Sequence, residues 1–251
     1  MAISEEAHRN YDELFPRHVS TLRITDPELT EYFDNFAFDD VIRHGSLDTR
    51  TRLMVQLAAL IGCQGLSEYR VMVGAALTVG VTPIEVKEIV YQSVAYVGMG
   101  KAFDFIHATN DVLTERGIEL PLPGQSTTTP ETRGEKGLAV QKEIVGADAV
   151  NQMYATAPAD QIHFQHFLSA NCFGDHYTRT GIDLKTRELL TFAMLVSLGG
   201  CEPQVKGHVA ANLNVGNDRA VLVSVITQLL PFIGYPRTLN ALRVINEGTT
   251  A

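Results

Sequence analysis

Four polar side chains with acid–base or nucleophilic chemistry gather in one stretch of this 251-residue chain, residues 187–216. Glu188 opens an apolar segment, and a Gly-Gly pair followed by a proline predicts a turn into a second helix. On that helix Cys201, Gln204 and His208 stand at positions i, i+3 and i+7, which places them on one stripe. A helical hairpin folds Glu188 back along the stripe. The spacing therefore predicts that a carboxylate, a thiol, an amide and an imidazole meet in one cavity.

Each of these side chains also has an ordinary structural explanation. A glutamate in the first turn of a helix interacts favourably with the helix dipole, and a buried cysteine usually acts as a small apolar residue. However, Cys201 stands at a helix N-terminus, where a thiolate is stabilised. We expect Glu188 and His208 to act as acid and base, and we keep Cys201 as a third catalytic candidate.

A second group of candidate side chains lies between residues 161 and 177. His163 and His166 are three residues apart on a predicted helix, and His176 follows shortly after. Their spacing matches no common zinc pattern, so we expect no metal and no cofactor, although the spacing alone leaves metal binding by these three histidines open. The hypothesis is that His166 and His176 line a substrate pocket together with Gln204.

The elements that position these residues occur twice in the chain. Shifting residues 75–110 by 136 positions aligns them with a second, similar segment. The matched pairs are Gly80 with Gly216, Gln92 with Gln228, Gly98 with Gly234 and Asn110 with Asn246. Apolar residues recur at helical spacing in both segments, and strand alternation is nowhere sustained. The pattern predicts an all-α fold built from two tandem units.

The predicted units are residues 1–117 and 134–251, and a segment rich in Pro, Gly and Thr at 118–133 links them. Within the first unit, residues 5–44 are expected to form helices that cover the first hairpin. Residues 139–172 are expected to take the same position in the second unit.

The first unit lacks the polar set of the second. At the offset of 136, Gly65 stands for Cys201, Glu68 for Gln204 and Met72 for His208, while Thr51 or Arg52 stands for Glu188. The first unit is therefore expected to be structural, or to lend wall residues to a site centred on the second.

Composition narrows the classes of partner. The formal net charge is −9, with 45% hydrophobic and 20% charged residues, as in an ordinary globular protein. An acidic surface repels nucleic acid and anionic membranes, so we expect neither as a partner. The first residues lack the features of a secretory signal, the apolar runs are short, and the three cysteines form no CxxC pair. These features favour a cytoplasmic protein with reduced thiols.

Residues 182–216 and 232–242 resemble the carboxymuconolactone decarboxylase family, which includes the AhpD-type alkylhydroperoxidases. The resemblance covers most of the chain and implies two AhpD-like helical units packed as a pseudo-dimer. It also implies a homo-oligomer, for which a trimer is favoured in a tandem chain. The peroxidase branch of the family carries Glu, CxxC and His, and these positions fall on Glu188, Cys201, Gln204 and His208. Gln204 replaces the second cysteine, so no disulfide can close a peroxidase cycle there.

The resemblance implies a carboxymuconolactone decarboxylase-like lyase or isomerase that acts on a small lactone or an enolisable carboxylate. Glu188 and His208 would supply the acid–base chemistry, because loss of CO2 leaves a dienolate that must be reprotonated. Gln204 would orient a carboxylate or stabilise an oxyanion. Two alternatives stay open, and with them whether the chain is an enzyme: a thiol peroxidase that uses Cys201 with an external thiol, and a non-catalytic binding or scaffold protein.

Overall fold

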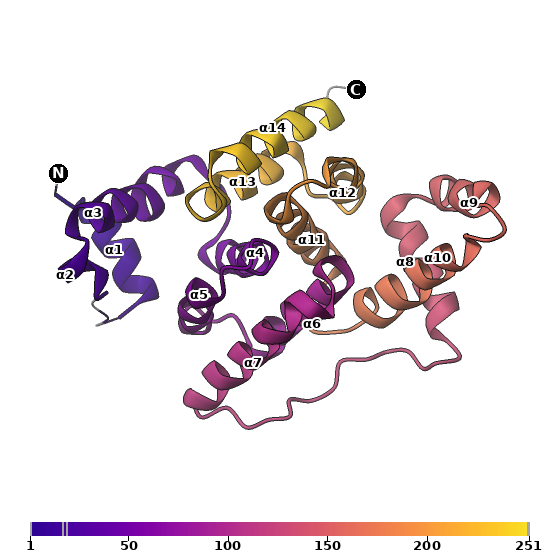
Figure 1. The fold of residues 1–251 in the computed structure, drawn as a ribbon, viewed down its shortest axis with the longest axis horizontal. Helices are drawn as coiled ribbons and strands as arrows, with labels where there is room; N and C mark the ends of the chain where they lie inside the picture. The colour runs from indigo at the N-terminus through magenta and orange to yellow at the C-terminus, as the bar shows by residue number, and fades with distance from the viewer. Residues whose placement is uncertain (1, 17, 19, 250–251) are drawn as a thin grey trace.

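The computed structural model describes residues 2–16, 18 and 20–249, and within them all regular structure is helical, as predicted (Figure 1). The first half contains α1 (Glu5–Leu14), α2 (Leu22–Thr25), α3 (Pro27–Asn35), the π-helix η1 (Phe36–Asp40), the 3-10 turn η2 (Ile42–His44), α4 (Thr49–Gly62), α5 (Leu66–Thr78), α6 (Pro83–Val97) and α7 (Met99–Glu115). The second half contains α8 (Arg133–Val145), α9 (Ala147–Thr156), α10 (Ile162–Phe167), the π-helix η3 (Leu168–Tyr177), α11 (Leu184–Leu198), α12 (Glu202–Asn214), α13 (Arg219–Ile233) and α14 (Tyr235–Thr249).

Helices α4 and α11 pack against each other at the centre of the molecule (Figure 1). Every residue from Arg52 to Gly62 and from Arg187 to Ser197 is buried. A helix that is apolar on nearly all sides must be covered on all sides, which explains the central position of both. Within the described residues, no helix combines the length and the apolar character needed to cross a membrane.

The two central helices begin in the same way, which fixes how the two units correspond. Each follows an aspartate whose carboxylate accepts a hydrogen bond from the backbone N–H three residues on. Counted from these caps, Asp48 and Asp183, the residue that corresponds to Glu188 is Leu53. The expectation that Glu188 matches one of the two residues before Leu53 was therefore wrong by one or two positions. An apolar side chain, and not a polar one, replaces the glutamate in the first unit.

The N-terminal segment of each unit packs partly on the other unit. Helix α1 contacts α5, as expected, but η1 and η2 pack on α13 of the second half. Gln228 there donates a hydrogen bond to the Val41 carbonyl, and the Ser46 N–H donates to the Ser224 hydroxyl. In the same way η3 packs on α6 of the first half, while α8 packs on α12. The expectation that each segment covers its own hairpin is thus wrong for η1, η2 and η3.

Helix α8 and η3 approach each other backbone to backbone. A Cβ atom on Gly137 would overlap the Ser169 carbonyl oxygen, and one on Gly174 would overlap the Arg133 carbonyl oxygen. The helix-free stretch between α7 and α8 also holds η3 in place, since the Thr128 hydroxyl donates to the Gly174 carbonyl. These contacts fix η3, and η3 carries side chains into the site described next.

Candidate active site

Glu188 and His208 form a hydrogen-bonded pair on adjacent helices. Glu188 lies in the buried part of α11, and its side chain is 0% exposed, whereas that of His208 on α12 is 18% exposed. Glu188 Oε2 lies 2.8 Å from His208 Nδ1. The other carboxylate oxygen, Oε1, has no hydrogen-bond partner among the described residues. Because Glu188 occupies Nδ1, Nε2 is the ring nitrogen left to exchange a proton with a bound molecule.

Asn212 holds the backbones that carry this pair. Its side-chain amide donates to the carbonyl oxygens of Glu188, at 3.1 Å, and of His208, at 2.7 Å. The Asn217 amide in turn donates to the Asn212 side-chain oxygen at 2.9 Å. These bonds tie α11 to α12 at the level of the pair, so the carboxylate and the imidazole are positioned before any ligand arrives.

A tyrosine from the first unit closes the site. The ring of Tyr96, near the end of α6, meets the His208 ring edge-on with 5.8 Å between centroids. Its hydroxyl donates to the Tyr177 hydroxyl at 2.9 Å and accepts from the Cys172 thiol at 3.6 Å. Tyr177 is also hydrogen-bonded to the Thr191 hydroxyl at 2.5 Å. The site is therefore composite, with one wall supplied by the unit that lacks the acid–base pair.

The groups behind the pair stay protonated at neutral pH. Burial raises the pKa of Tyr96 and that of Tyr177 well above the ordinary value of 10, with a smaller contribution from the charge of Glu188. Burial also raises the pKa of the Cys172 thiol to about 11. These three groups can donate hydrogen bonds, but they are poor nucleophiles or bases.

A buried ionic network continues from this hydroxyl chain. Gln92 donates to the Thr191 hydroxyl at 2.8 Å and accepts from the Arg187 guanidinium at 3.0 Å. Arg187 also donates to Glu88 at 2.9 Å, and Arg179 meets the same carboxylate with two nitrogens. The network joins α6 of the first unit to α11 of the second. Through Thr191 it is connected to the hydroxyls of Tyr177 and Tyr96.

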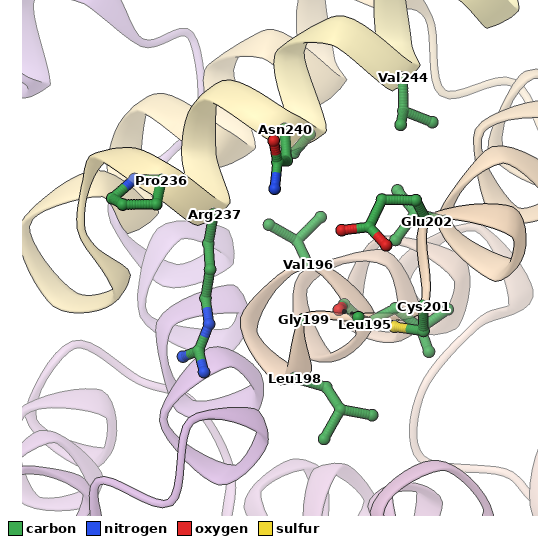
Figure 2. Close-up of a pocket in the computed structure, with 13 residues that line it drawn as sticks. Leu195, Val196, Leu198, Gly199, Cys201, Glu202, Pro236, Arg237, Asn240 and Val244 are labelled. Atoms are coloured by element: carbon green, nitrogen blue, oxygen red, sulfur yellow. Dashed lines mark hydrogen bonds between the residues drawn. The ribbon is translucent and has the colours of Figure 1, made fainter.

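The structure places Cys201 away from the pair. Cys201 is the N-cap of α12, and its thiol donates to the Leu195 carbonyl at 3.2 Å. It lines a pocket of ≈ 250 Å³ whose wall includes neither Glu188 nor His208 (Figure 2). Burial, and then the neighbouring charge of Glu202, raise the pKa of the Cys201 thiol. The predicted meeting of thiol and imidazole in one cavity is not found.

The other candidate residues are scattered. Gln204 is exposed on α12, and His166 is exposed with its ring against Tyr154. His163 is exposed beside two phenylalanine rings. His176 is half-buried in η3, where burial lowers its pKa and its Nδ1 has no partner among the described residues. Within those residues, no group of three or more His, Cys, Asp or Glu side chains is placed to hold a metal ion.

Sequence reasoning missed Tyr96, Cys172, Tyr177 and Thr191. The pairing of the two units contains a signal for Tyr96: at the offset of 136, Phe232 takes its place, a polar-to-apolar change like that from His208 to Met72. A buried position that is polar in one unit and apolar in the other is a candidate for the site, because the fold itself accepts either.

Comparisons with known proteins bear on the family and on the duplication. The model of the carboxymuconolactone decarboxylase family matches the chain twice, at residues 27–111 and 163–247. The 4-carboxymuconolactone decarboxylase of Acinetobacter baylyi is 30% identical over 117 residues, which is 47% of this chain and 87% of that protein. An uncharacterized 15.0 kDa protein of the nqo9-nqo10 intergenic region in Paracoccus denitrificans is 31% identical over 97 residues, 38% of this chain and 67% of that protein. The double match confirms the predicted duplication.

Proposed function

The chain belongs to the carboxymuconolactone decarboxylase family, and we propose that it is a carboxy-lyase for a small lactone or enolisable carboxylate. The observation that carries the proposal is the hydrogen bond between the buried Glu188 carboxylate and the partly exposed His208 imidazole. A carboxylate that orients a histidine through Nδ1 leaves Nε2 directed at a bound molecule, where it can donate or accept a proton. The same pair would serve an isomerase that moves a proton between two carbons of such a substrate.

In the proposed reaction, the carbon–carbon bond to the substrate carboxylate breaks and CO2 leaves. The bonding electron pair moves into the conjugated carbonyl system and forms a dienolate. Protonated His208 then donates its Nε2 proton to carbon, and the imidazole regains a proton from solvent. Glu188 stabilises the imidazolium that precedes this transfer. The balance is one proton consumed and one CO2 released per turnover.

The test is release of CO2 from 4-carboxymuconolactone by the full chain and by variants of the pair. His208→Asn and Glu188→Gln are each expected to lower kcat by about 10²- to 10⁴-fold, the usual contribution of a positioned acid or base. Cys201→Ser is the matched control and is expected to keep activity, since Cys201 lines a pocket whose wall includes neither Glu188 nor His208. A His208→Asn variant with unchanged kcat would contradict the proposal.

Substrate contacts are part of the same proposal. His176 is proposed to contact the substrate, because it lies in η3, beside Tyr177. Gln204 and His166 remain proposals with less support, since both are exposed and neither is hydrogen-bonded to the pair. Replacing His176 with Phe is expected to raise KM more than it lowers kcat.

The thiol-peroxidase alternative has less support. The raised pKa of Cys201 lowers the thiolate fraction that attacks peroxide, and its thiol is hydrogen-bonded to a backbone carbonyl. Peroxide turnover that disappears in Cys201→Ser would favour this alternative. A chain that turns over neither substrate would favour the binding or scaffold role.

A further inference from the structure

The pocket that Cys201 lines lies between the start of α12 and the start of α14, and neither Glu188 nor His208 lines it. Its volume is ≈ 250 Å³, and its floor is apolar and includes Val196 and Val244. Three polar side chains surround it: the Glu202 carboxylate, the Asn240 amide and the Arg237 guanidinium (Figure 2). Glu202 comes from α12, while the other two come from α14. The pocket therefore presents a negative and a positive wall above an apolar floor.

The charges on these walls do not neutralise each other. Among the described residues, neither Glu202 nor Arg237 forms an ion pair or a hydrogen bond, and the Asn240 amide has no hydrogen bond. Opposite charges attract each other. Two that border one small pocket without pairing can both pair with a molecule that lies between them. Each wall thus keeps its full hydrogen-bonding capacity for a ligand.

The fold does not require the Glu202 carboxylate. At the offset of 136, Leu66 takes the place of Glu202, so the first unit builds the same hairpin without the carboxylate, while Lys101 keeps a positive charge in the place of Arg237. Gly199 makes room for the arginine. Its φ is +72°, and a Cβ there would lie 3.2 Å from Arg237 Nε. Glycine is the residue that adopts this backbone conformation freely and lets the guanidinium lie against the main chain.

We propose that this pocket binds a small zwitterion, an α-amino acid with an apolar side chain. Its carboxylate lies against Arg237 and Asn240, its ammonium against Glu202, and its side chain on the floor that includes Val196 and Val244. A ligand with only one charge would place an apolar group against either Glu202 or Arg237. That side chain would then lose water without gaining a partner, which costs free energy. The pocket volume is below the range typical of drug-sized ligands, which suits a molecule of this size.

The experiment is isothermal titration calorimetry on the full chain with three probes of matched shape. L-leucine carries both charges, 4-methylpentanoate lacks the ammonium, and 3-methylbutylamine lacks the carboxylate. We expect leucine to bind at least 10-fold more tightly than either singly charged probe. Binding at this pocket needs no turnover, so the result is independent of the proposed lyase reaction.

Two variants locate the binding. Arg237→Gln is expected to weaken leucine at least 10-fold, until it binds no better than 3-methylbutylamine, and Glu202→Gln is expected to bring leucine to the level of 4-methylpentanoate. Arg243→Gln, on the outer face of α14 where Arg243 pairs with Glu247, is the matched control and keeps full affinity. Far-UV circular dichroism checks that each variant is folded.

The proposal is overturned if leucine binds the wild type no more tightly than the singly charged probes. It is also overturned if leucine affinity changes less than twofold in both folded variants. Should either variant fail to fold, the three-probe comparison on the wild type decides alone.

Discussion

Glu88 and Glu188 are two carboxylates that the fold withdraws from water in different ways. Glu88 meets Arg179 and Arg187 and has both oxygens occupied. Glu188 has one histidine for one oxygen and no partner among the described residues for the other. A buried carboxylate with both oxygens paired serves the structure, whereas Glu188 keeps one oxygen that can accept a further hydrogen bond. The contrast explains why we assign chemistry to Glu188 and not to Glu88.

The structural role of Glu88 leads to a stability prediction. Glu88→Gln leaves the fully buried Arg187 and the partly buried Arg179 without their carboxylate. Removing one partner of a buried pair costs about 3–5 kcal/mol, so we expect a loss of this size in the free energy of unfolding, measured by urea denaturation. Glu247→Gln, which breaks the exposed pair with Arg243, is the control and is expected to cost less than about 1 kcal/mol. Equal losses in the two variants would argue against a structural role for the network.

The raised pKa of Cys172 predicts a loss of stability at alkaline pH. The thiol titrates near its ordinary value of 9 in the unfolded chain and at about 11 in the folded one. Stability from the neutral buried thiol is therefore complete below pH 9 and is lost as the pH rises to 11. Two pKa units correspond to about 2–3 kcal/mol. We expect the free energy of unfolding to fall less steeply between pH 9 and 11 in Cys172→Ala than in the wild type. Parallel curves would contradict the prediction.

At the scale of the elements, the π-helix η3 decides the shape of the site. It brings Cys172 and Tyr177 to the composite site, and α8 holds it by contact between backbones at Gly137. π-helical turns recur at functional sites because the wider turn redirects side chains. The equivalent segment of the first unit, η1, is also a π-helix, of 5 residues against 10 in η3, so both units keep the distortion and η3 extends it.

Substituting Gly137 tests this packing. Gly137→Ala forces a Cβ into the Ser169 carbonyl, so we expect a loss of several kcal/mol in the free energy of unfolding and a lower kcat, because η3 must shift. Gly134→Ala, in the first turn of the same helix with open space around it, is expected to be neutral or to stabilise by up to about 1 kcal/mol. Both are measured by thermal and urea unfolding. A Gly137→Ala variant as stable as Gly134→Ala would show that α8 and η3 can separate without cost.

Helical spacing correctly predicted that Glu188 and His208 meet, but it misplaced Cys201. The i, i+3, i+7 stripe assumes that all its members are helical, yet Cys201 has the extended φ of −133° that belongs to an N-cap. The thiol therefore donates to the Leu195 carbonyl and does not meet His208. Helix boundaries are uncertain by one or two residues in any sequence-based assignment, and a stripe that starts on the boundary inherits that uncertainty.

At the scale of the whole molecule, the two units are interlocked. Tyr96 from the first unit closes the site of the second, and Gln92 bonds to Thr191 across the same boundary. The duplication and the all-α fold were predictable from the sequence because periodicity and a constant offset are local properties. The crossing of η1 and η3 to the opposite unit was not, since it depends on packing between residues many positions apart.

Each of the two units exposes an equivalent apolar surface, and these two surfaces are candidate contacts of a homo-oligomer. Met99 and Phe103 on α7 are each 53% exposed, and Tyr235 and Leu239 on α14, 136 positions later, are 61% and 57% exposed. Exposed apolar side chains that repeat on both units are typical of interfaces. A chain with two equivalent faces can bind two neighbours and close a ring of few subunits. We therefore keep a homo-trimer as the prediction.

Sedimentation velocity tests the trimer and the faces that would form it. The wild type is expected to sediment as a trimer, and a variant that carries both Phe103→Glu and Leu239→Glu is expected to sediment as a monomer, because two charges would be buried at each contact. Phe164→Glu is the control: Phe164 is also strongly exposed, at 62%, but lies on α10, outside both faces. It should leave the trimer intact. A wild-type monomer would contradict the prediction, and a trimer that survives the double substitution would move the interface away from α7 and α14.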